Sequence, residues 1–222
     1  EELVDFPYVN VGLFADESVE IPQFTEEIRE LLLTKASEEF NWRDISPTIF
    51  GAVFESTLNP ETRRSGGMHY TSIENIHKVI DPLFLDELQE EFETIQAYKT
   101  LNVKRKKLMD FQEKLAHLKF LDPACGSGNF LTETYLSLRR LENKVLRVLY
   151  GEGQGVLGVA ASDIIKVSIQ QFYGIEINDF AVTVAKTALW IAESQMLDET
   201  KNIIYGLDGD FLPLKTYVNI TE

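Results

Sequence analysis

The sequence contains a single cysteine, Cys125, among its 222 residues. One thiol excludes a disulfide framework and suits a reducing cytosol, so we expect a cytoplasmic protein. Its three histidines, His69, His77 and His117, are dispersed and offer no metal-site spacing. The chain has no apolar run that approaches the length of a membrane span, and it has no visible signal peptide. We therefore expect neither a metal in this segment nor a membrane anchor.

Positive charge is also scarce. The chain has 21 Lys and Arg against 36 Asp and Glu, a net charge of −15. The acid is uneven, because residues 1–40 hold eleven Asp and Glu and only two Lys and Arg. Contact with DNA needs Lys and Arg on one face, so this balance argues against a simple nucleic-acid binder. If a larger parent protein binds DNA, its binding surface lies mostly outside this segment.

The rest of the composition is ordinary for a globular protein, with 44% hydrophobic and 26% charged residues. The length fits one full domain, or one domain plus a fragment. Thr25 can cap a first helix. The inner face of that helix is expected to comprise Ile28, Leu31, Leu32 and Phe40. Ser46-Pro47 predicts a second helix start, followed by an apolar stripe at Ile49, Val53 and Phe54. We interpret residues 1–65 as a helical spacer or N-terminal extension.

Further helices are predicted over residues 66–118. Thr71 and Glu74 have the spacing of a capping box, and Asp81-Pro82 is expected to end that helix and start the next. One helix face of the following stretch should then carry Leu101, Leu108, Phe111, Leu115 and Leu118. The basic run 104–107 (KRKK) lies within this stretch. It is either a solvated face or a contact for phosphate.

Residues 121–130 read LDPACGSGNF. They follow a short apolar run that suits a buried strand and precede a segment that suits a helix. A strand, a glycine loop and a helix let a backbone approach a nucleoside cofactor closely. The loop lacks the third glycine of the dinucleotide fingerprint and the Lys-Ser/Thr pair of a P-loop. The alternative is a plain tight turn into a helix.

A second strand is predicted over 172–177 (FYGIEI), before a helix capped by Asn178 or Asp179. Glu176 at its end can accept two hydrogen bonds from the vicinal hydroxyls of a ribose. The alternative is a carboxylate that merely favours the helix N-terminus. Glu176 follows Gly128 by 48 residues, against about twenty in a compact dinucleotide unit, so the region around 151–170 is expected to be an insertion. The alternation of strands and helices predicts a parallel α/β sheet.

Asp122-Pro-Ala-Cys-Gly-Ser-Gly-Asn-Phe130 resembles motif I of S-adenosylmethionine-dependent DNA methyltransferases that act on an exocyclic amine. GMHYTSIENIHKVI, at 67–80, resembles motif X of the same enzymes. Motif X ahead of motif I is the order called gamma, typical of adenine-N6 enzymes. LNPETRRSGGMHYTS and FYGIEINDFAVTVAKTALWIAESQM resemble the large fused restriction–modification enzymes of type IIG and IIL, and less closely the modification subunits of type I systems.

The resemblance implies a partial class I, Rossmann-like methyltransferase sheet with an N-terminal helical region. Residues 66–222 would form the first part of the S-adenosylmethionine-binding domain, with motifs X, I and II. The parent protein would methylate N6 of adenine in duplex DNA. The implied cofactor-binding residues are Tyr70, Thr71, Asp122, Pro123, Ala124, Cys125, Gly126, Gly128, Asn129, Phe130, Glu176 and Ile177.

The Asn-Pro-Pro-aromatic signature of motif IV, which aims the target amine, does not occur in these residues. We therefore expect no catalytic residue here and no activity of this segment alone. Contact with DNA would come from a recognition domain C-terminal to it. Asp210 either touches adenine or lies in a surface loop, and Cys125 is expected to be a packed small residue rather than a nucleophile. The alternatives are a non-catalytic binding or assembly fragment, and an RNA or small-molecule methyltransferase.

Overall fold

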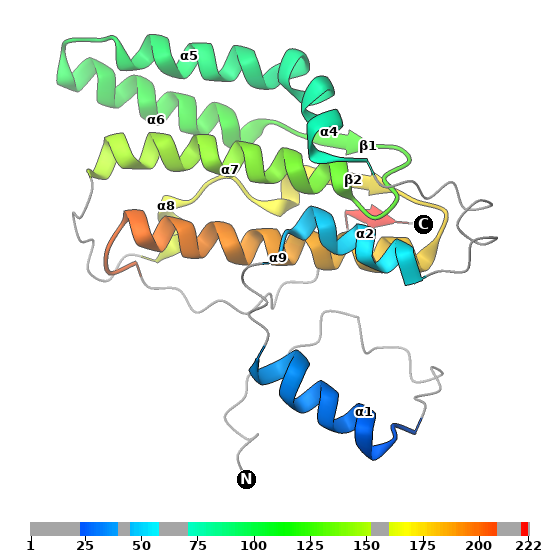
Figure 1. The fold of residues 1–222 in the computed structure, drawn as a ribbon. Coiled ribbons are helices and arrows are strands. Elements are labelled where there is room, and N and C mark those ends of the chain that lie inside the picture. The colour runs from blue at the N-terminus through cyan, green and yellow to red at the C-terminus, as the bar shows by residue number, and fades with distance from the viewer. Residues whose placement is uncertain (1–22, 40–44, 58–70, 152–159, 208–218, 222) are drawn as a thin grey trace.

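A computed structural model describes residues 23–39, 45–57, 71–151, 160–207 and 219–221. Helices dominate, and three short strands form one sheet (Figure 1). The elements before the sheet are α1 (Glu26–Leu31), η1 (Leu32–Glu38), α2 (Pro47–Thr57), α4 (Ile73–Ile80), η3 (Asp81–Leu85), α5 (Asp86–Gln96) and α6 (Leu101–His117). The remaining elements are β1 (Phe120–Asp122), α7 (Asn129–Tyr150), α8 (Ala161–Ile164), η4 (Ile169–Gln171), β2 (Phe172–Ile175), α9 (Asp179–Ile203) and β3 (Ile220–Thr221).

The sheet is parallel throughout, in the order β1-β2-β3. Phe120 pairs with Phe172 and Asp122 with Gly174, so the carboxyl ends of β1 and β2 lie at the same edge. The inner face packs against α7, where the ring of Tyr135 meets Phe172 edge-on at 5.5 Å. On the outer face, Leu121 is 63% exposed although a buried strand was expected there. The sheet is thus covered by described helices on one face.

Helix α7 runs through the middle of the helical layer, between α6 and α9 (Figure 1). It is buried nearly all round, because α2, α4, α6, α9 and the sheet all contact it. Glycines with positive φ flank this helix, Gly128 at its start and Gly151 at its end. Asn178 caps α9 by accepting the Ala181 amide at 3.0 Å, as expected.

The helix expected to end at Asp81-Pro82 continues instead. Residues 73–96 form one helical run, in which the π-helical segment η3 carries Pro82. Proline removes a backbone donor, and a π-helical turn accommodates that loss without a break. The break falls between Gln96 and Leu101, so α5 and α6 form a hairpin (Figure 1). Leu108, Phe111 and Leu115 share a buried face of α6, as predicted. Leu101 was expected on the same apolar face, but it is 80% exposed.

The first helix corrects another expectation. Thr25 does cap α1, accepting the Ile28 amide at 3.3 Å. Its apolar face is not an inner face among the described residues, because Ile28, Leu31 and Leu32 are 45%, 53% and 44% exposed. Phe40 lies outside the described residues. In Figure 1, α1 stands apart from the other helices.

Candidate functional site

The glycine loop leaves the carboxyl end of β1 and turns directly into α7. The Asp122 carboxylate accepts a hydrogen bond from the Ala124 amide at 3.1 Å, and the Gly128 amide donates to the Cys125 carbonyl at 2.8 Å. The Cys125 amide donates to the Ile175 carbonyl at 3.0 Å, which ties the loop to the end of β2. These bonds fix the loop as a compact turn at the sheet edge.

Two glycines of the loop have different roles. Gly126 has φ of 53° and Gly128 has φ of 78°, values that favour glycine because a side chain would be strained. A Cβ on Gly128 would also lie 2.8 Å from the Ala185 Cβ of α9, so close helix packing requires glycine there. A Cβ on Gly126 would meet nothing within 4 Å. Gly126 therefore leaves open space above the backbone.

Glu176 lies one residue beyond β2, and its carboxylate reaches the glycine loop. One oxygen, Oε2, accepts the Gly126 amide at 2.8 Å, and Oε1 accepts the Asn178 amide at 2.9 Å. The residue is only 7% exposed, and each oxygen keeps a further lone pair. The next residue, Ile177, is 83% exposed. Motifs that are 50 residues apart in sequence therefore meet at one sheet edge.

The other loop residues lie as a strand-loop-helix layout requires. Pro123 and Ala124 are exposed on the loop. Asn129 begins α7, is 7% exposed, and its Oδ1 has no hydrogen-bond partner within the part of the chain that the structure describes. Phe130 is half-buried and packs against an apolar cluster on α4 and η3. Helix α4 thus contacts the start of α7.

Thr71 is half-buried just ahead of α4, but it does not cap that helix. Ser72 is the capping residue and accepts the Asn75 amide at 3.4 Å, so the expected box of Thr71 and Glu74 is wrong by one position. The helix begins one residue later than predicted, which leaves the Thr71 hydroxyl outside the cap. Tyr70 and Asp210 lie outside the described residues.

Cys125 is a buried residue of the glycine loop, with 6% of its surface exposed. Burial raises the pKa of its thiol to about 12, and the carboxylates of Asp122 and Glu176 act in the same direction. We expect the native protein to resist iodoacetamide at pH 7.5, because the thiolate is the nucleophile and its fraction is small. The unfolded protein should react readily, and mass spectrometry of both samples tests this. Rapid labelling of the folded protein would contradict the assignment of Cys125 as a packed residue.

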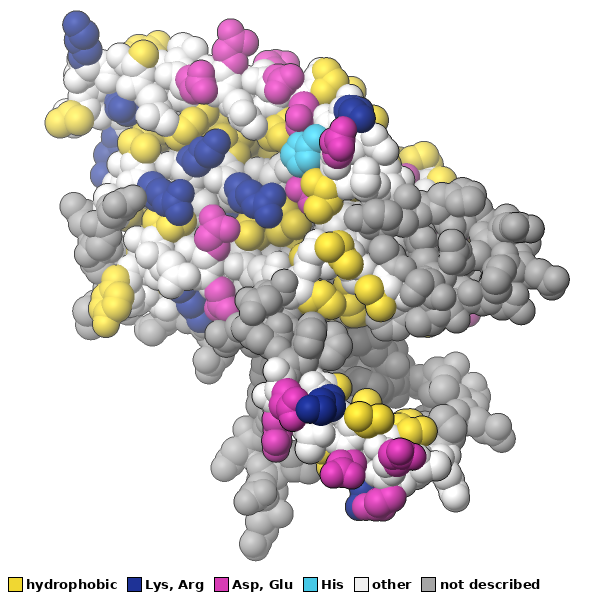
Figure 2. Space-filling view, in the orientation of Figure 1, with side chains coloured by type: hydrophobic (Ala, Val, Ile, Leu, Met, Phe, Trp, Pro, Cys, Tyr) yellow, Lys and Arg dark blue, Asp and Glu magenta, His cyan; other side chains and the backbone are white. Residues whose placement is uncertain are grey.

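The basic run of α6 makes contacts within the chain. Lys104 donates to the Gln96 carbonyl at 2.8 Å, Arg105 donates to the Leu149 carbonyl at 3.3 Å, and Lys107 lies 5.2 Å from the centre of the Tyr98 ring. Figure 2 shows Lys and Arg side chains gathered over α6 and α7, with acidic side chains on α5 and on α1. These contacts favour the interpretation as a solvated face over a phosphate contact.

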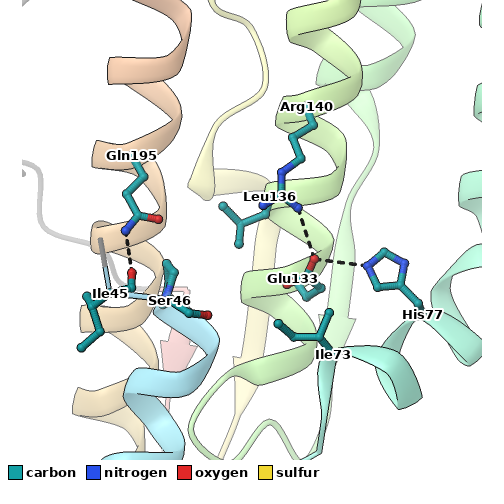
Figure 3. A pocket seen from close by; sticks show the side chains of 9 residues that line it. Ile45, Ser46, Ile73, His77, Glu133, Leu136, Arg140 and Gln195 are labelled. Carbon is teal, nitrogen blue, oxygen red and sulfur yellow. Dashed lines mark hydrogen bonds and ion pairs between the residues drawn. The ribbon is translucent and has the colours of Figure 1, made fainter. Parts of the chain in front are cut away.

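A cavity of about 410 Å³ lies between α2, α4, α7 and α9 (Figure 3). Its polar lining centres on Glu133, whose side chain is 3% exposed. Glu133 accepts hydrogen bonds from Thr48 Oγ1 at 3.3 Å, His77 Nε2 at 3.2 Å and Arg140 Nη1 at 3.4 Å. Since His77 Nδ1 also meets Asp81 at 2.7 Å, both ring nitrogens face carboxylates. This cluster holds α2, α4 and α7 together, and its charges balance when His77 is protonated.

His77 makes this cluster dependent on pH. The hydrogen bond to Asp81 raises the pKa of His77 above its ordinary value, burial opposes this, and Glu133 acts with Asp81. The stabilisation is therefore complete below about pH 6.5, the unfolded value, and is lost as the pH rises through the folded value. We expect a loss below about 1 kcal/mol, because the side chain is 32% exposed. Urea denaturation between pH 6 and 8.5 tests this, and an identical pH dependence in His77→Gln would contradict it.

Sequence reasoning missed Glu133, His77 and Gly51. Glu133 is a charged residue at a buried helix position, and such residues are rare without a partner. The amphipathic pattern of α7 could have revealed Glu133, because it places this charged residue on the buried face of the helix. Gly51 of α2 packs against the glycine loop, where a Cβ on it would lie 2.6 Å from Ser127 Oγ. No sequence pattern indicated this contact, because a glycine within a predicted helix does not reveal what it packs against.

The parallel sheet with a glycine loop and helices on one face is a partial Rossmann-like α/β fold, as predicted. Residues 98–222 match the family model described as MmeI, DNA-methyltransferase domain, and the chain belongs to that family. The expected resemblance to the large fused restriction–modification methyltransferases is thereby confirmed.

Two known proteins show the extent of the similarity. The chain is 44% identical over 214 residues to DNA methyltransferase A of Bacillus subtilis (strain 168), across 96% of this chain and 23% of that protein. It also superimposes on the type IIL restriction–modification enzyme MmeI, solved in complex with DNA, with a TM-score of 0.82 and 42% identity. That match covers 100% of this chain and 28% of the MmeI chain. The sequence therefore spans about a quarter of the length of each relative.

In the described ranges, no helix has the length and apolar character needed to cross a membrane. The same residues hold no cluster of three His, Cys, Asp or Glu side chains arranged for a metal ion.

Proposed function

We propose that this chain binds S-adenosylmethionine and forms the cofactor-binding part of a DNA methyltransferase that modifies N6 of adenine in duplex DNA. The observation that carries the proposal is the bond between the Glu176 carboxylate and the Gly126 amide, which brings motifs I and II to one sheet edge. Residues 66–222 would belong to the methyltransferase domain and residues 1–65 to a helical spacer. The parent would be a restriction–modification protein.

The residues present fit the cofactor. Glu176 offers the remaining lone pairs of a buried carboxylate to the two ribose hydroxyls. Gly126 leaves space for the backbone to be approached closely, and exposed Ile177 offers an apolar surface for a ring. Asn129 Oδ1 is a buried acceptor that no donor among the described residues satisfies, which suits the ammonium of an amino acid moiety. Thr71 and Tyr70 would contribute near the carboxylate of that moiety.

Bound S-adenosylmethionine supplies an electrophilic methyl group. The residues of this chain would bind and orient the cofactor, so that the methyl group points toward the amine of a base flipped out of the duplex. The tightly packed loop would limit the freedom of a bound cofactor, because Gly128 lies against Ala185 and the Cys125 amide is bonded to the Ile175 carbonyl. The groups that position the target amine would belong to motif IV, whose signature does not occur in these residues. Contact with DNA would come from a C-terminal recognition domain of the parent.

The proposal predicts the chemical product of the reaction. The parent protein, given labelled S-adenosylmethionine and duplex DNA, should yield N6-methyladenine on nucleoside analysis. Residues 1–222 alone should transfer no label, since the Asn-Pro-Pro-aromatic signature is not among them. Label found as 5-methylcytosine, or transfer by residues 1–222 alone, would contradict the proposal.

A further inference from the structure

Helix α2 belongs to the region before the glycine loop in sequence, yet it packs directly on that loop. Its Gly51 is buried, and a Cβ at this position would lie 2.6 Å from Ser127 Oγ, 2.9 Å from Ser127 Cβ and 3.0 Å from Asn129 Oδ1. Real Cβ atoms essentially never approach other atoms this closely. Glycine is therefore required at position 51 for this helix to contact the loop.

The contact is fixed in place at the N-terminal end of α2. The hydroxyl of Thr48, which is fully buried, donates to Glu133 of α7 at 3.3 Å. The carbonyl of Ile45, just before the helix, accepts a hydrogen bond from Gln195 of α9 at 2.7 Å. Helix α2 thus cannot move away from Ser127 without breaking bonds to both α7 and α9.

The loop is confined by two helices. Ser127 and Asn129 meet Gly51 of α2, whereas Gly128 between them meets Ala185 of α9 at a distance that excludes any side chain. Both contacts require glycine, because neither leaves room for a Cβ atom. The backbone around Gly126, including the amide that binds Glu176, is held in its conformation by this packing.

We infer that Gly51 is a positioning residue for the cofactor loop, and that α2 couples the N-terminal region to cofactor affinity. This inference rests on the proposed function. An added methyl group at position 51 would push α2 and the Ser127–Asn129 segment apart, and the loop amides would lose their alignment. Movement of α2 by the preceding chain would act on the cofactor in the same way.

The test substitution is Gly51→Ala, compared with Ile49→Ala on the same helix. Alanine favours a helix over glycine, so propensity alone predicts a more stable α2 in Gly51→Ala. We expect instead that affinity for S-adenosylmethionine, measured by calorimetry, falls about tenfold, because small misplacements of positioning groups are costly. The control removes side-chain atoms from a residue that is 46% exposed, and it should bind as the unsubstituted protein does.

Hydrogen exchange gives a second measurement that needs no cofactor. Amides of residues 125–130 should exchange faster in Gly51→Ala than in Ile49→Ala. If the unsubstituted protein does not bind S-adenosylmethionine, the proposed function fails, and the exchange rates still decide whether Gly51 positions the loop. Thr48→Val removes the hydroxyl that binds Glu133, so it loosens α2 without adding atoms. If Gly51→Ala is too unstable to purify, Thr48→Val replaces it in both measurements.

Rescue separates positioning from general destabilisation. Ser127→Gly removes both atoms nearest to the new methyl group. The double substitution Gly51→Ala with Ser127→Gly should therefore exchange more slowly, and bind more tightly, than the two single effects added together. Strict additivity, or wild-type affinity and exchange in Gly51→Ala, would overturn the inference.

Discussion

Replacing Glu176 with alanine should lower the affinity for S-adenosylmethionine on the order of a hundredfold or more. Two hydrogen bonds from ribose hydroxyls to a charged acceptor would be lost, each worth about 1.5–3 kcal/mol. The substitution also removes the acceptor for the Gly126 and Asn178 amides, which lie 2.8 and 2.9 Å from the carboxylate oxygens. Calorimetric titration of both proteins measures the difference.

The control for this prediction is Asp179→Ala. Asp179 also places a carboxylate in the first turn of α9, but it is exposed and binds the Phe180 amide at 2.6 Å. If Glu176 acts only as a favourable charge at a helix N-terminus, the two substitutions should have similar effects. We expect Asp179→Ala to change affinity less than about threefold. Equal losses in both variants would remove the ribose role of Glu176.

The second large effect concerns stability. Glu142 of α7 is fully buried and accepts hydrogen bonds from Gln112 at 2.6 Å and from the Lys166 amide at 2.7 Å. It also forms an ion pair with Arg139, which is 1% exposed. Glu142→Ala leaves a buried guanidinium without its anion, so it should destabilise the protein by about 3–5 kcal/mol. The shift of the urea midpoint at unchanged slope reports this loss.

Two controls identify the cause. Arg139→Met with Glu142→Gln removes both charges but keeps an amide oxygen for the Lys166 amide, so this pair should be more stable than Glu142→Ala. Glu74→Ala breaks an ion pair between Glu74 and Lys78, whose side chains are 83% and 64% exposed, respectively. This substitution should lower the free energy of unfolding by less than about 0.5 kcal/mol. A mild effect of Glu142→Ala, similar to that of Glu74→Ala, would show that the buried pair is unimportant for stability.

Local sequence patterns predicted the elements around the shared edge of β1 and β2. The glycine loop, the strand before Glu176 and the cap at Asn178 depend on residues adjacent in the chain, and each occurs as expected, although β2 ends at Ile175 rather than at residue 177. Parallel pairing then brings Glu176 to Gly126, because the carboxyl ends of neighbouring parallel strands share an edge. This part of the candidate site follows from short-range rules plus one topological rule.

Contacts between distant helices could not be predicted in the same way. The Gly51 contact with Ser127 and the bond between His77 and Glu133 join segments whose relative placement no local pattern specifies. Pro82 predicted the end of a helix, but the helix continues through it because a π-helical turn accommodates the proline. The apolar stripe of α1 correctly indicated a helix, but amphipathicity does not state what covers the stripe.

The most direct test of cofactor binding at the glycine loop is an NMR titration of the isotope-labelled protein with S-adenosylmethionine. We predict saturable shifts in the amides of Gly126, Gly128, Glu176 and Ile177, which lie at the shared edge of β1 and β2. Shifts confined to His77 and the other residues that line the cavity around Glu133, or no saturable shifts at all, would contradict the assignment.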